Sequence, residues 1–484
     1  MKLLLINAYF GGEGSSETDA MTFCPPLGLG YIGTYVRDNT TCEVEIVDPV
    51  PQKFSKEDVL RKAATADIVG LSCYTDVRFD CFDFAQAVKR VNPDCKLVVG
   101  GPHVFFLDQL ILEHYSFVDV VVRGEGEETM KELVSGKPYE NIEGITWRDS
   151  NNKIVRNSDR ELIRNLDDIY VDYSLLPDSS LYAGDIELPT AMRKLRTVYM
   201  IESRGCPSRC IYCANDHWKR RFRTVSPERT VEKMEHLVKT QGIELFRFCD
   251  DLFTASKKRV FAFCNALKEK KLNVKFKIEV RADTAKEVLE ALREVGCVSV
   301  SIGIESGSDK MLKRIEKGIT RKQIIDVIEL CRQLEMWVQG YVMVAIPGET
   351  MSDFRKTLKV SKLPDILGEN IFRVLPGTPF YKELRLDGKI DDGIWFDQNR
   401  YKGMIFYWKE NFADAPFSKK KAQWLALYAK YYHFLHRPIK LIKHHGFFVG
   451  LSMLMVALLD IPLKGYLYRI AFKYKHIYRK FTIR

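Results

Sequence analysis

Residues 202–213 read ESRGCPSRCIYC and place three thiols, Cys206, Cys210 and Cys213, in the spacing C-x3-C-x2-C. Thiolates are soft ligands that suit iron–sulfur clusters and zinc, and a cubane cluster normally takes four of them. No fourth cysteine lies nearby, since the next one along the chain is Cys249. The spacing therefore predicts an iron–sulfur cluster with one metal position open to a non-protein ligand, which distinguishes catalytic from closed structural metal sites.

A β-prone run at 197–201 precedes the thiols, so we expect them on a loop at a strand end, where rigid scaffolds usually present reactive groups. The competing interpretation is a zinc knuckle with a distant fourth ligand such as His217. A zinc site usually offers a second close pair of Cys or His residues, and no such pair follows. The sequence favours the cluster.

The same residues resemble the radical S-adenosylmethionine (SAM) enzymes, whose signature is C-x3-C-x2-C with an aromatic residue before the last cysteine. Tyr212 fills that place here. In that family the open iron chelates the amino and carboxyl groups of SAM, and an electron from the cluster splits SAM to a 5′-deoxyadenosyl radical. The resemblance implies a [4Fe–4S] cluster on the three thiols, SAM as a second cofactor, and a reductant such as flavodoxin or ferredoxin as a partner.

Composition is typical of a globular protein from a reducing compartment. The length of 484 residues suggests about three domains, and a chain with 46% hydrophobic and 29% charged residues can build an ordinary core. Twelve cysteines lack the paired spacing of secreted domains, and no apolar leader follows Met1. We therefore expect a cytoplasmic protein.

Residues 1–135 alternate short apolar runs with amphipathic stretches, which predicts a doubly wound parallel α/β sheet of Rossmann-like type. The expected strands are 3–6, 44–47, 68–71, 97–99 and 118–122. Such sheets bind ligands outside the carboxyl ends of their strands. Polar or glycine-rich turns stand at three of those ends and supply Ser72, Tyr74, Thr75, Gly100, Gly101, Pro102, His103, Gly124, Glu125, Gly126 and Glu127. The alternative is a plain flavodoxin-like domain with ordinary tight turns.

The order of these segments resembles the cobalamin-binding domain that precedes the barrel in the B12-dependent branch of the radical SAM family. The motifs are PPLGL at 25–29, VGGPH at 99–103 and RGEGE at 123–127, and the resemblance implies that the eleven turn residues bind cobalamin. One motif is missing: D-x-H-x-x-G, which supplies a lower axial histidine in many B12 proteins, is replaced by NAYFGG at 7–12. Many members of the branch also lack it. His103 is a candidate axial ligand, although a histidine in a turn more often only forms hydrogen bonds.

Turn formers and charges fill 136–195, which we interpret as an inter-domain linker with a hairpin-like piece at 144–147 and 153–155. From 196 to 384 six strands are expected, at 197–201, 245–248, 275–280, 298–304, 337–345 and 370–374. Helical patterns such as 230–240, 285–295 and 321–334 separate them, which predicts a partial (β/α)6 barrel with its site at the carboxyl ends of the strands. The family resemblance implies that residues at these ends bind SAM, namely Tyr212, Asp250, Asp251, Glu279, Arg281, Gly303, Glu305 and Gly307.

Residues 385–484 are expected to be mainly helical and are strongly basic. The net charge of +10 arises here, because 418–484 contains fourteen Lys and Arg residues against the single acid Asp460, which leaves about −3 for the remainder. The run 446–459 carries no charge and is too short to span a bilayer, but it suits an interfacial segment. Its Tyr-, Phe-, Lys- and Arg-rich flanks favour contact of 440–484 with an anionic membrane surface. A buried helix and a basic aromatic patch for RNA are the alternatives, and nucleic acid is the less favoured partner.

Taken with the resemblance, the sequence predicts a B12-dependent radical SAM methyltransferase. The deoxyadenosyl radical would abstract hydrogen from an unactivated carbon of a small molecule or lipid, and the carbon radical would take a methyl group from methylcobalamin. Two alternatives stay open: radical cyclisation or rearrangement without methyl transfer, and a non-catalytic sensor of cobalamin or redox state. A tRNA methylthiotransferase would need three further N-terminal cysteines in a recognisable set, which this chain lacks. We expect a cytoplasmic enzyme peripheral to the inner face of the membrane.

Overall fold

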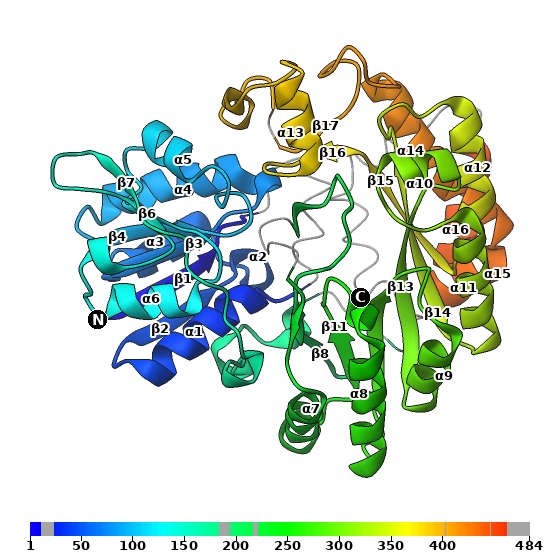
Figure 1. The fold of residues 1–484 in the computed structure, drawn as a ribbon, viewed down its shortest axis with the longest axis horizontal. Helices are drawn as coiled ribbons and strands as arrows, with labels where there is room; N and C mark the ends of the chain where they lie inside the picture. The colour runs from blue at the N-terminus through cyan, green and yellow to red at the C-terminus, as the bar shows by residue number, and fades with distance from the viewer. Residues whose placement is uncertain are drawn as a thin grey trace.

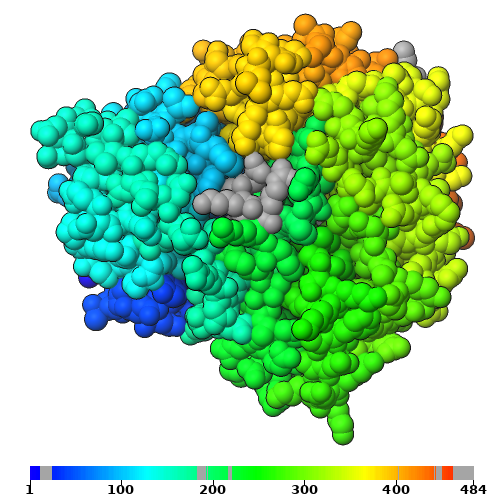
Figure 2. Space-filling view, viewed as in Figure 1, coloured from blue at the N-terminus to red at the C-terminus, as the bar shows by residue number. Residues whose placement is uncertain are grey.

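The computed structural model describes residues 1–10, 24–182, 192, 195–215, 221–401, 403–445 and 447–461. Figure 1 shows an N-terminal α/β unit in blue and cyan, a barrel in green, and a C-terminal part in yellow to red that reaches over both. The space-filling view in Figure 2 shows the three parts in contact on one face of the molecule. No described helix is long and apolar enough to cross a membrane.

The N-terminal unit is a seven-stranded sheet in the order β2-β1-β3-β4-β5-β6-β7, with the first five strands parallel. Its strands are β1 (Lys2–Asn7), β2 (Glu43–Val47), β3 (Ile68–Ser72), β4 (Lys96–Gly100), β5 (Val120–Val122), β6 (Ile145–Arg148) and β7 (Ile154–Arg156). Helices α1 (Leu27–Asn39) and α6 (Glu127–Val134) cover one face, and α3 (Lys56–Ala63), α4 (Arg78–Val91) and α5 (Asp108–His114) cover the other (Figure 1). Because both faces are covered, the central strands β1, β3, β4 and β5 are largely apolar, whereas the edge strand β2 carries Glu43 and Glu45. The predicted doubly wound fold is confirmed.

The N-terminal sheet extends beyond the boundary predicted at 135. β6 and β7, expected as a hairpin inside a linker, pair antiparallel to β5 and to each other. Trp147 and Ile145 are buried on the sheet, and this burial explains why the hairpin joins it. The chain from 157 to 182 then runs along α1, where Arg37 pairs with Asp172 at 2.6 Å. The segment predicted as a linker is therefore largely packed against the first unit.

The barrel is an open sheet of six parallel strands in the order β8-β11-β12-β13-β14-β15. These are β8 (Thr197–Met200), β11 (Leu245–Phe248), β12 (Lys275–Val280), β13 (Cys297–Glu305), β14 (Trp337–Val344) and β15 (Ile366–Ile371). The helices between them are α7 (Pro227–Gln241), α8 (Lys257–Glu269), α9 (Lys286–Glu294), α11 (Arg321–Gln333) and α12 (Met351–Ser361). The predicted partial barrel is confirmed. The last strand, β15, begins earlier than the predicted 370–374. It is a half-exposed edge strand with polar residues, so its sequence shows only a weak apolar pattern.

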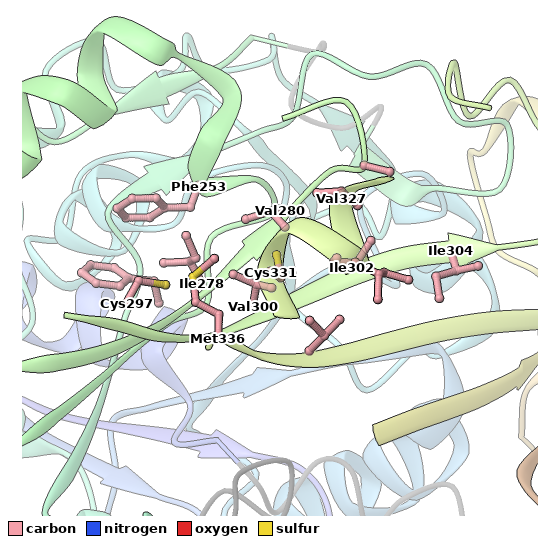
Figure 3. Close-up of a cluster of buried hydrophobic side chains, with 14 of the residues drawn as sticks. Phe253, Ile278, Val280, Cys297, Val300, Ile302, Ile304, Val327, Cys331 and Met336 are labelled. Carbon is pink, nitrogen blue, oxygen red and sulfur yellow. The ribbon is translucent and has the colours of Figure 1, made fainter. Parts of the chain in front are cut away.

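Apolar side chains between the barrel sheet and its helices form the hydrophobic core of the barrel. Ile278, Val300 and Ile302 are fully buried and pack toward α11 (Figure 3). Because side chains alternate across a strand, the residues between them face the inside of the barrel. There Lys277 is 1% exposed and donates a hydrogen bond to Gln339 Oε1 at 2.9 Å. The barrel interior beneath the mouth is thus polar.

The turn after β14 contains a buried carboxyl group that makes barrel stability sensitive to pH. Glu349 accepts a hydrogen bond from the Ala345 N–H at 2.7 Å, but burial raises its pKa from 4.5 to about 8. Because the folded chain holds this proton more tightly than the unfolded chain, stability falls as pH rises from about 4.5 through about 8. The expected slope is at most roughly 1.4 kcal/mol per pH unit.

Urea unfolding at several pH values measures this effect, and Glu349→Gln is the comparison. The glutamine keeps the neutral shape, so the difference in unfolding free energy between the variant and the native chain should grow in favour of the variant as pH rises. Parallel pH profiles for the two proteins would contradict the assignment.

The C-terminal part binds to both other parts. It contains α13 (Pro379–Leu386), a ribbon of β16 (Arg373–Val374) and β17 (Ile405–Phe406), and α14 (Lys419–His436), α15 (Pro438–His445) and α16 (Phe447–Asp460). Arg78 at the start of α4 is fully buried and donates to the carbonyls of Trp395, Tyr401 and Gly403 at 2.8, 3.0 and 2.6 Å. α14 covers the β15 edge of the barrel. The chain after the barrel therefore returns to the N-terminal unit before it covers the open edge.

Candidate active site

The three thiols and most of the predicted SAM residues line one cavity at the carboxyl ends of the barrel strands. Its volume is about 350 Å³, within the range of ligand pockets, and barrels of this kind hold their sites at this end. The predicted residues in its lining are Cys206, Cys210, Cys213, Tyr212, Asp251, Glu279, Arg281, Gly303 and Glu305. Four strand ends thus bring together side chains that are far apart in sequence.

Asp250, predicted to bind SAM, does not line this cavity. It is 1% exposed and accepts hydrogen bonds from the Glu202 N–H at 3.3 Å and from the Ser203 hydroxyl. Burial raises its pKa to about 6. The carboxyl group holds the chain that leads into the thiol loop, so its role is structural, and its neighbour Asp251 is the acid that faces the cavity.

Gly307, also predicted to bind SAM, lies under α12. Its N–H donates to Thr357 Oγ1 at 3.0 Å, and a Cβ at this position would lie 2.3 Å from the Lys356 carbonyl oxygen. The glycine is required for this close approach of two backbone segments. Gly307 does not line the cavity, and the packing of α12 accounts for the glycine.

The thiols of this loop, Cys206, Cys210 and Cys213, are the cluster ligands that the spacing predicts, and all three line the cavity. Among the described residues, no three Cys, His, Asp or Glu side chains form a cage for one ion. The thiolates of a cubane bind different irons, so they lie farther apart than the ligands of one ion. Burial raises the pKa of Cys213 to about 11, which keeps this thiol protonated until a metal displaces the proton. His217, the alternative zinc ligand, lies outside the described residues.

A buried group of three polar side chains forms the wall beside the thiols. Glu305 Oε1 accepts from the Tyr212 hydroxyl at 2.9 Å and pairs with Lys317 Nζ at 2.8 Å. Gly303 leaves room for this pair, because a Cβ there would lie 2.5 Å from the carboxylate oxygen and 2.6 Å from Nζ. Lys317 lines the cavity, yet the sequence reasoning missed it. A lone lysine in a loop after a helix carries no signal of its own.

A second cavity of about 340 Å³ lies at the carboxyl ends of β3, β4 and β5. Its predicted lining residues are Ser72, Tyr74, Gly100, Gly101, Pro102, Gly124, Glu125, Gly126 and Glu127. A Cβ at Gly100 or Gly124 would meet no protein atom closer than 3.8 Å, and one at Gly28 would meet none within 4 Å. Gly28 and Gly100 therefore open space for a ligand, whereas the positive φ of 78° at Gly124 favours glycine for the backbone itself. Together with apolar side chains of α1 and α6, they fit a large, partly apolar cofactor such as cobalamin.

Of the residues assigned to cobalamin, His103 and Thr75 do not line this cavity. His103 is fully buried, its Nδ1 lies 3.2 Å from Thr75 Oγ1, and its ring packs edge-on against Trp395. Burial and the nearby Arg78 lower its pKa well below the usual value. The structure therefore places His103 beneath the C-terminal part, with its Nε2 buried and without a hydrogen-bond partner, and its role as an axial ligand stays a prediction.

Glu125 and Glu127 line the cavity, but their carboxylates bind arginines of the barrel. Arg204 pairs with both, at 2.6 Å for Glu125, and Arg223 pairs with Glu125 at 2.9 Å. Both glutamate side chains are only 3% exposed. Their main role is thus to join the two domains. The sequence reasoning missed Arg204 as a site residue because two motifs 77 and more residues apart give no sign that they meet.

The two cavities share Asp251, which lines both. A model of the B12 binding domain matches residues 19–134, and a model of the radical SAM superfamily matches residues 200–360. An uncharacterised methyltransferase of Pyrococcus horikoshii is 32% identical over 93% of this chain and 96% of its own length. The chain belongs to the cobalamin-dependent radical SAM family.

Two further comparisons place this radical SAM enzyme among proteins of different activity. An anaerobic magnesium-protoporphyrin IX monomethyl ester cyclase of Rubrivivax gelatinosus is 27% identical over 79% of this chain and 70% of its own. The solved structure of the cobalamin-dependent SAM radical enzyme OxsB, with aqua-cobalamin and SAM bound, has a TM-score of 0.67 at 18% identity, over 96% of this chain and 72% of that one. That likeness shows a shared fold.

The predicted family, fold and cofactors are therefore confirmed: this radical SAM enzyme uses a [4Fe–4S] cluster, SAM and cobalamin. The assignments of individual side chains to SAM or to cobalamin stay predictions, supported by their places in the two cavities.

Proposed function

We propose that this enzyme transfers a methyl group to an unactivated carbon of a small molecule or lipid. The observation that carries the proposal is the contiguity of the two cavities, because Asp251 lines the thiol cavity and the glycine-walled cavity alike. When bound, the cluster and SAM supply a 5′-deoxyadenosyl radical, and cobalamin supplies the methyl group. Flavodoxin or ferredoxin is the proposed electron donor.

The chain's own residues position these groups and do not carry the chemistry themselves. Cys206, Cys210 and Cys213 hold the cluster. Arg281 lines the same cavity and is fixed by hydrogen bonds to Ser208 Oγ at 2.9 Å and to the Lys317 carbonyl at 2.7 Å. The guanidinium also pairs with Asp283 at 3.0 Å, so the carboxylate of SAM would share it with that side chain. Beside the thiol loop, Lys317 pairs with Glu305 and Arg281 pairs with Asp283, so each cation has a carboxylate partner.

The wall opposite the thiols comes from the last strands and the start of the C-terminal part. Tyr341 and Met343 of β14, Asn370 of β15 and Arg373 of β16 line it. We propose that this wall contacts the substrate, because the thiols and the first strands already account for the cofactor side. The C-terminal part then takes part in substrate selection.

Transfer of a labelled methyl group from SAM to cobalamin tests the proposal before any substrate is known. The enzyme is reconstituted anaerobically with iron, sulfide and cobalamin, given SAM with a deuterated methyl group, and reduced. We expect mass spectrometry to find the label on cobalamin and 5′-deoxyadenosine in solution. Release of 5′-deoxyadenosine without labelled cobalamin would favour the second candidate, a radical cyclase, which the cyclase relatives support. A cluster that never cleaves SAM would indicate a sensor.

Gly28 offers a way to remove cobalamin while leaving SAM cleavage intact. It lines the second cavity from the first turn of α1, and no protein atom lies within 4 Å of where its Cβ would be. Gly28→Trp should fill the cavity without disturbing the fold and weaken cobalamin binding at least about tenfold, the loss of roughly 1.4 kcal/mol. Gly28→Ala, the matched control, should bind normally.

Cobalamin absorbance after gel filtration measures the first effect, and 5′-deoxyadenosine release measures the second. The tryptophan variant should release 5′-deoxyadenosine like the native enzyme. Equal cobalamin binding by both variants would contradict the placement of the cofactor in this cavity.

A further inference from the structure

One helix of the C-terminal part turns an apolar face to the surface. The side chains on this face of α16 are 40–60% exposed, at Leu451, Met455, Val456, Leu458 and Leu459. Their spacing of three and four residues places them on one side of the helix. We call this set the α16 face. Surface helices of soluble proteins ordinarily carry polar residues on the outward side, and contiguous exposed apolar patches mark interaction sites.

The inner side of α16 fixes the helix on the enzyme. Ala457 is buried in a cluster with Tyr431 and Phe434 of α14, and Met453 and Leu454 pack against it. The carboxyl group of Asp460 is fully buried and accepts a hydrogen bond from the Tyr431 hydroxyl at 2.7 Å. The only acid of 418–484 is therefore hidden from the surface. The α16 face is held in place and carries no negative charge.

Basic residues flank the α16 face on both sides in the sequence. The stretch 462–484 contains seven Lys and Arg residues and no acid, interleaved with Tyr and Phe. Before it, α15 exposes Ile439 at 69%. Lys440 of the same helix pairs with Asp365 at 2.9 Å, so the charge complementarity rests on the sequence of 462–484. An apolar stripe flanked by cations and aromatic residues is complementary to an anionic bilayer, whose interior takes the apolar side chains and whose headgroups take the cations.

We propose that the α16 face docks the enzyme on an anionic membrane surface, with α16 lying in the plane of the interface. A helix of 14 residues is about 21 Å long, shorter than the roughly 30 Å hydrocarbon core, so it lies on the bilayer and does not cross it. In Figure 1, α16 and α15 lie on the side of the barrel away from the N-terminal unit. Docking therefore leaves the cobalamin domain facing the aqueous side.

Vesicle flotation of the full-length enzyme tests the proposal. The protein is mixed with vesicles of phosphatidylcholine and phosphatidylserine, or of phosphatidylcholine alone. We expect at least about tenfold more protein to float with the anionic vesicles, and this difference to shrink at high salt because surface charges are screened. The variant Leu458→Glu/Leu459→Glu should lose at least about tenfold of that binding, since it places two anions on the α16 face.

Leu386→Glu is the matched control, because Leu386 at the end of α13 is 89% exposed and lies outside the α16 face. This variant should float like the native chain. Both variants should release 5′-deoxyadenosine normally, which shows that they are folded.

Three results would overturn the proposal. The first is absence of flotation with anionic vesicles. The second is flotation of the double variant equal to that of the native chain. The third is a dimer, or a complex with a single-stranded RNA probe, that the double variant abolishes while flotation is unchanged. The outcome is independent of methyl transfer, which the label experiment tests separately.

Discussion

The variant in which Cys206, Cys210 and Cys213 are all replaced by alanine is expected to release no 5′-deoxyadenosine after anaerobic reconstitution and reduction. These thiols line one wall of the barrel cavity and are the ligands that the three-thiolate spacing predicts. Without them no cluster forms to pass an electron to SAM. The expected loss is complete within the limit of detection, and iron and sulfide bound per chain should fall in parallel.

Cys42→Ala is the matched control, since this thiol is also buried but lines neither cavity. It should keep its iron and its 5′-deoxyadenosine release. Residual cleavage of SAM by the triple variant would refute the cluster assignment. Retention of iron without cleavage would indicate a metal bound elsewhere.

Replacing Arg204 with alanine is expected to destabilise the contact between the two domains by roughly 3–5 kcal/mol, because removing one partner of a buried ion pair strands the other charge. Glu127 and Glu125 are 3% exposed and both pair with this guanidinium. Arg223 still reaches Glu125, so Glu127 is the group left without its cation. Urea unfolding followed by circular dichroism measures the loss.

Two comparisons sharpen this experiment. Arg221→Ala removes an exposed pair with Glu161, in which both side chains are at least 60% exposed, and should change stability by less than about 1 kcal/mol. The double variant Arg204→Met/Glu127→Gln removes both buried charges and should be more stable than Arg204→Met alone. If Arg204→Ala and Arg221→Ala lose the same stability, the buried pair does not hold the domains together.

The elements that sequence patterns could predict are those with strong local periodicity. β3 begins at Ile68, as expected, because it is buried on both faces and reads as a continuous apolar run. The cluster thiols were also predictable, since three ligands within eight residues form a local signal. By contrast, β15 was misplaced because an edge strand buries little and shows weak alternation.

The parts of the site that sequence reasoning missed depend on contacts between distant segments. Lys317 reaches Glu305 across a loop, and Arg204 reaches Glu127 across the domain boundary. Asp250 and His103 do not line the cavities, because other segments of the chain bury them. A motif fixes which residue types stand at a strand end, but the direction of each side chain depends on what packs beside it.

The buried Arg78 has a consequence for how the molecule can open. Its hydrogen bonds to the carbonyls of Trp395, Tyr401 and Gly403 tie the chain after the barrel back to the N-terminal unit, while Arg204 ties the start of the barrel to that same unit. Two separate sets of contacts, at Arg78 and at Arg204, therefore join the N-terminal unit to the rest of the molecule. Separation of the cobalamin domain from the barrel requires that both sets of contacts break. The relative orientation of the cobalamin domain and the barrel is therefore fixed from both ends of the barrel chain, which holds the two cavities next to each other.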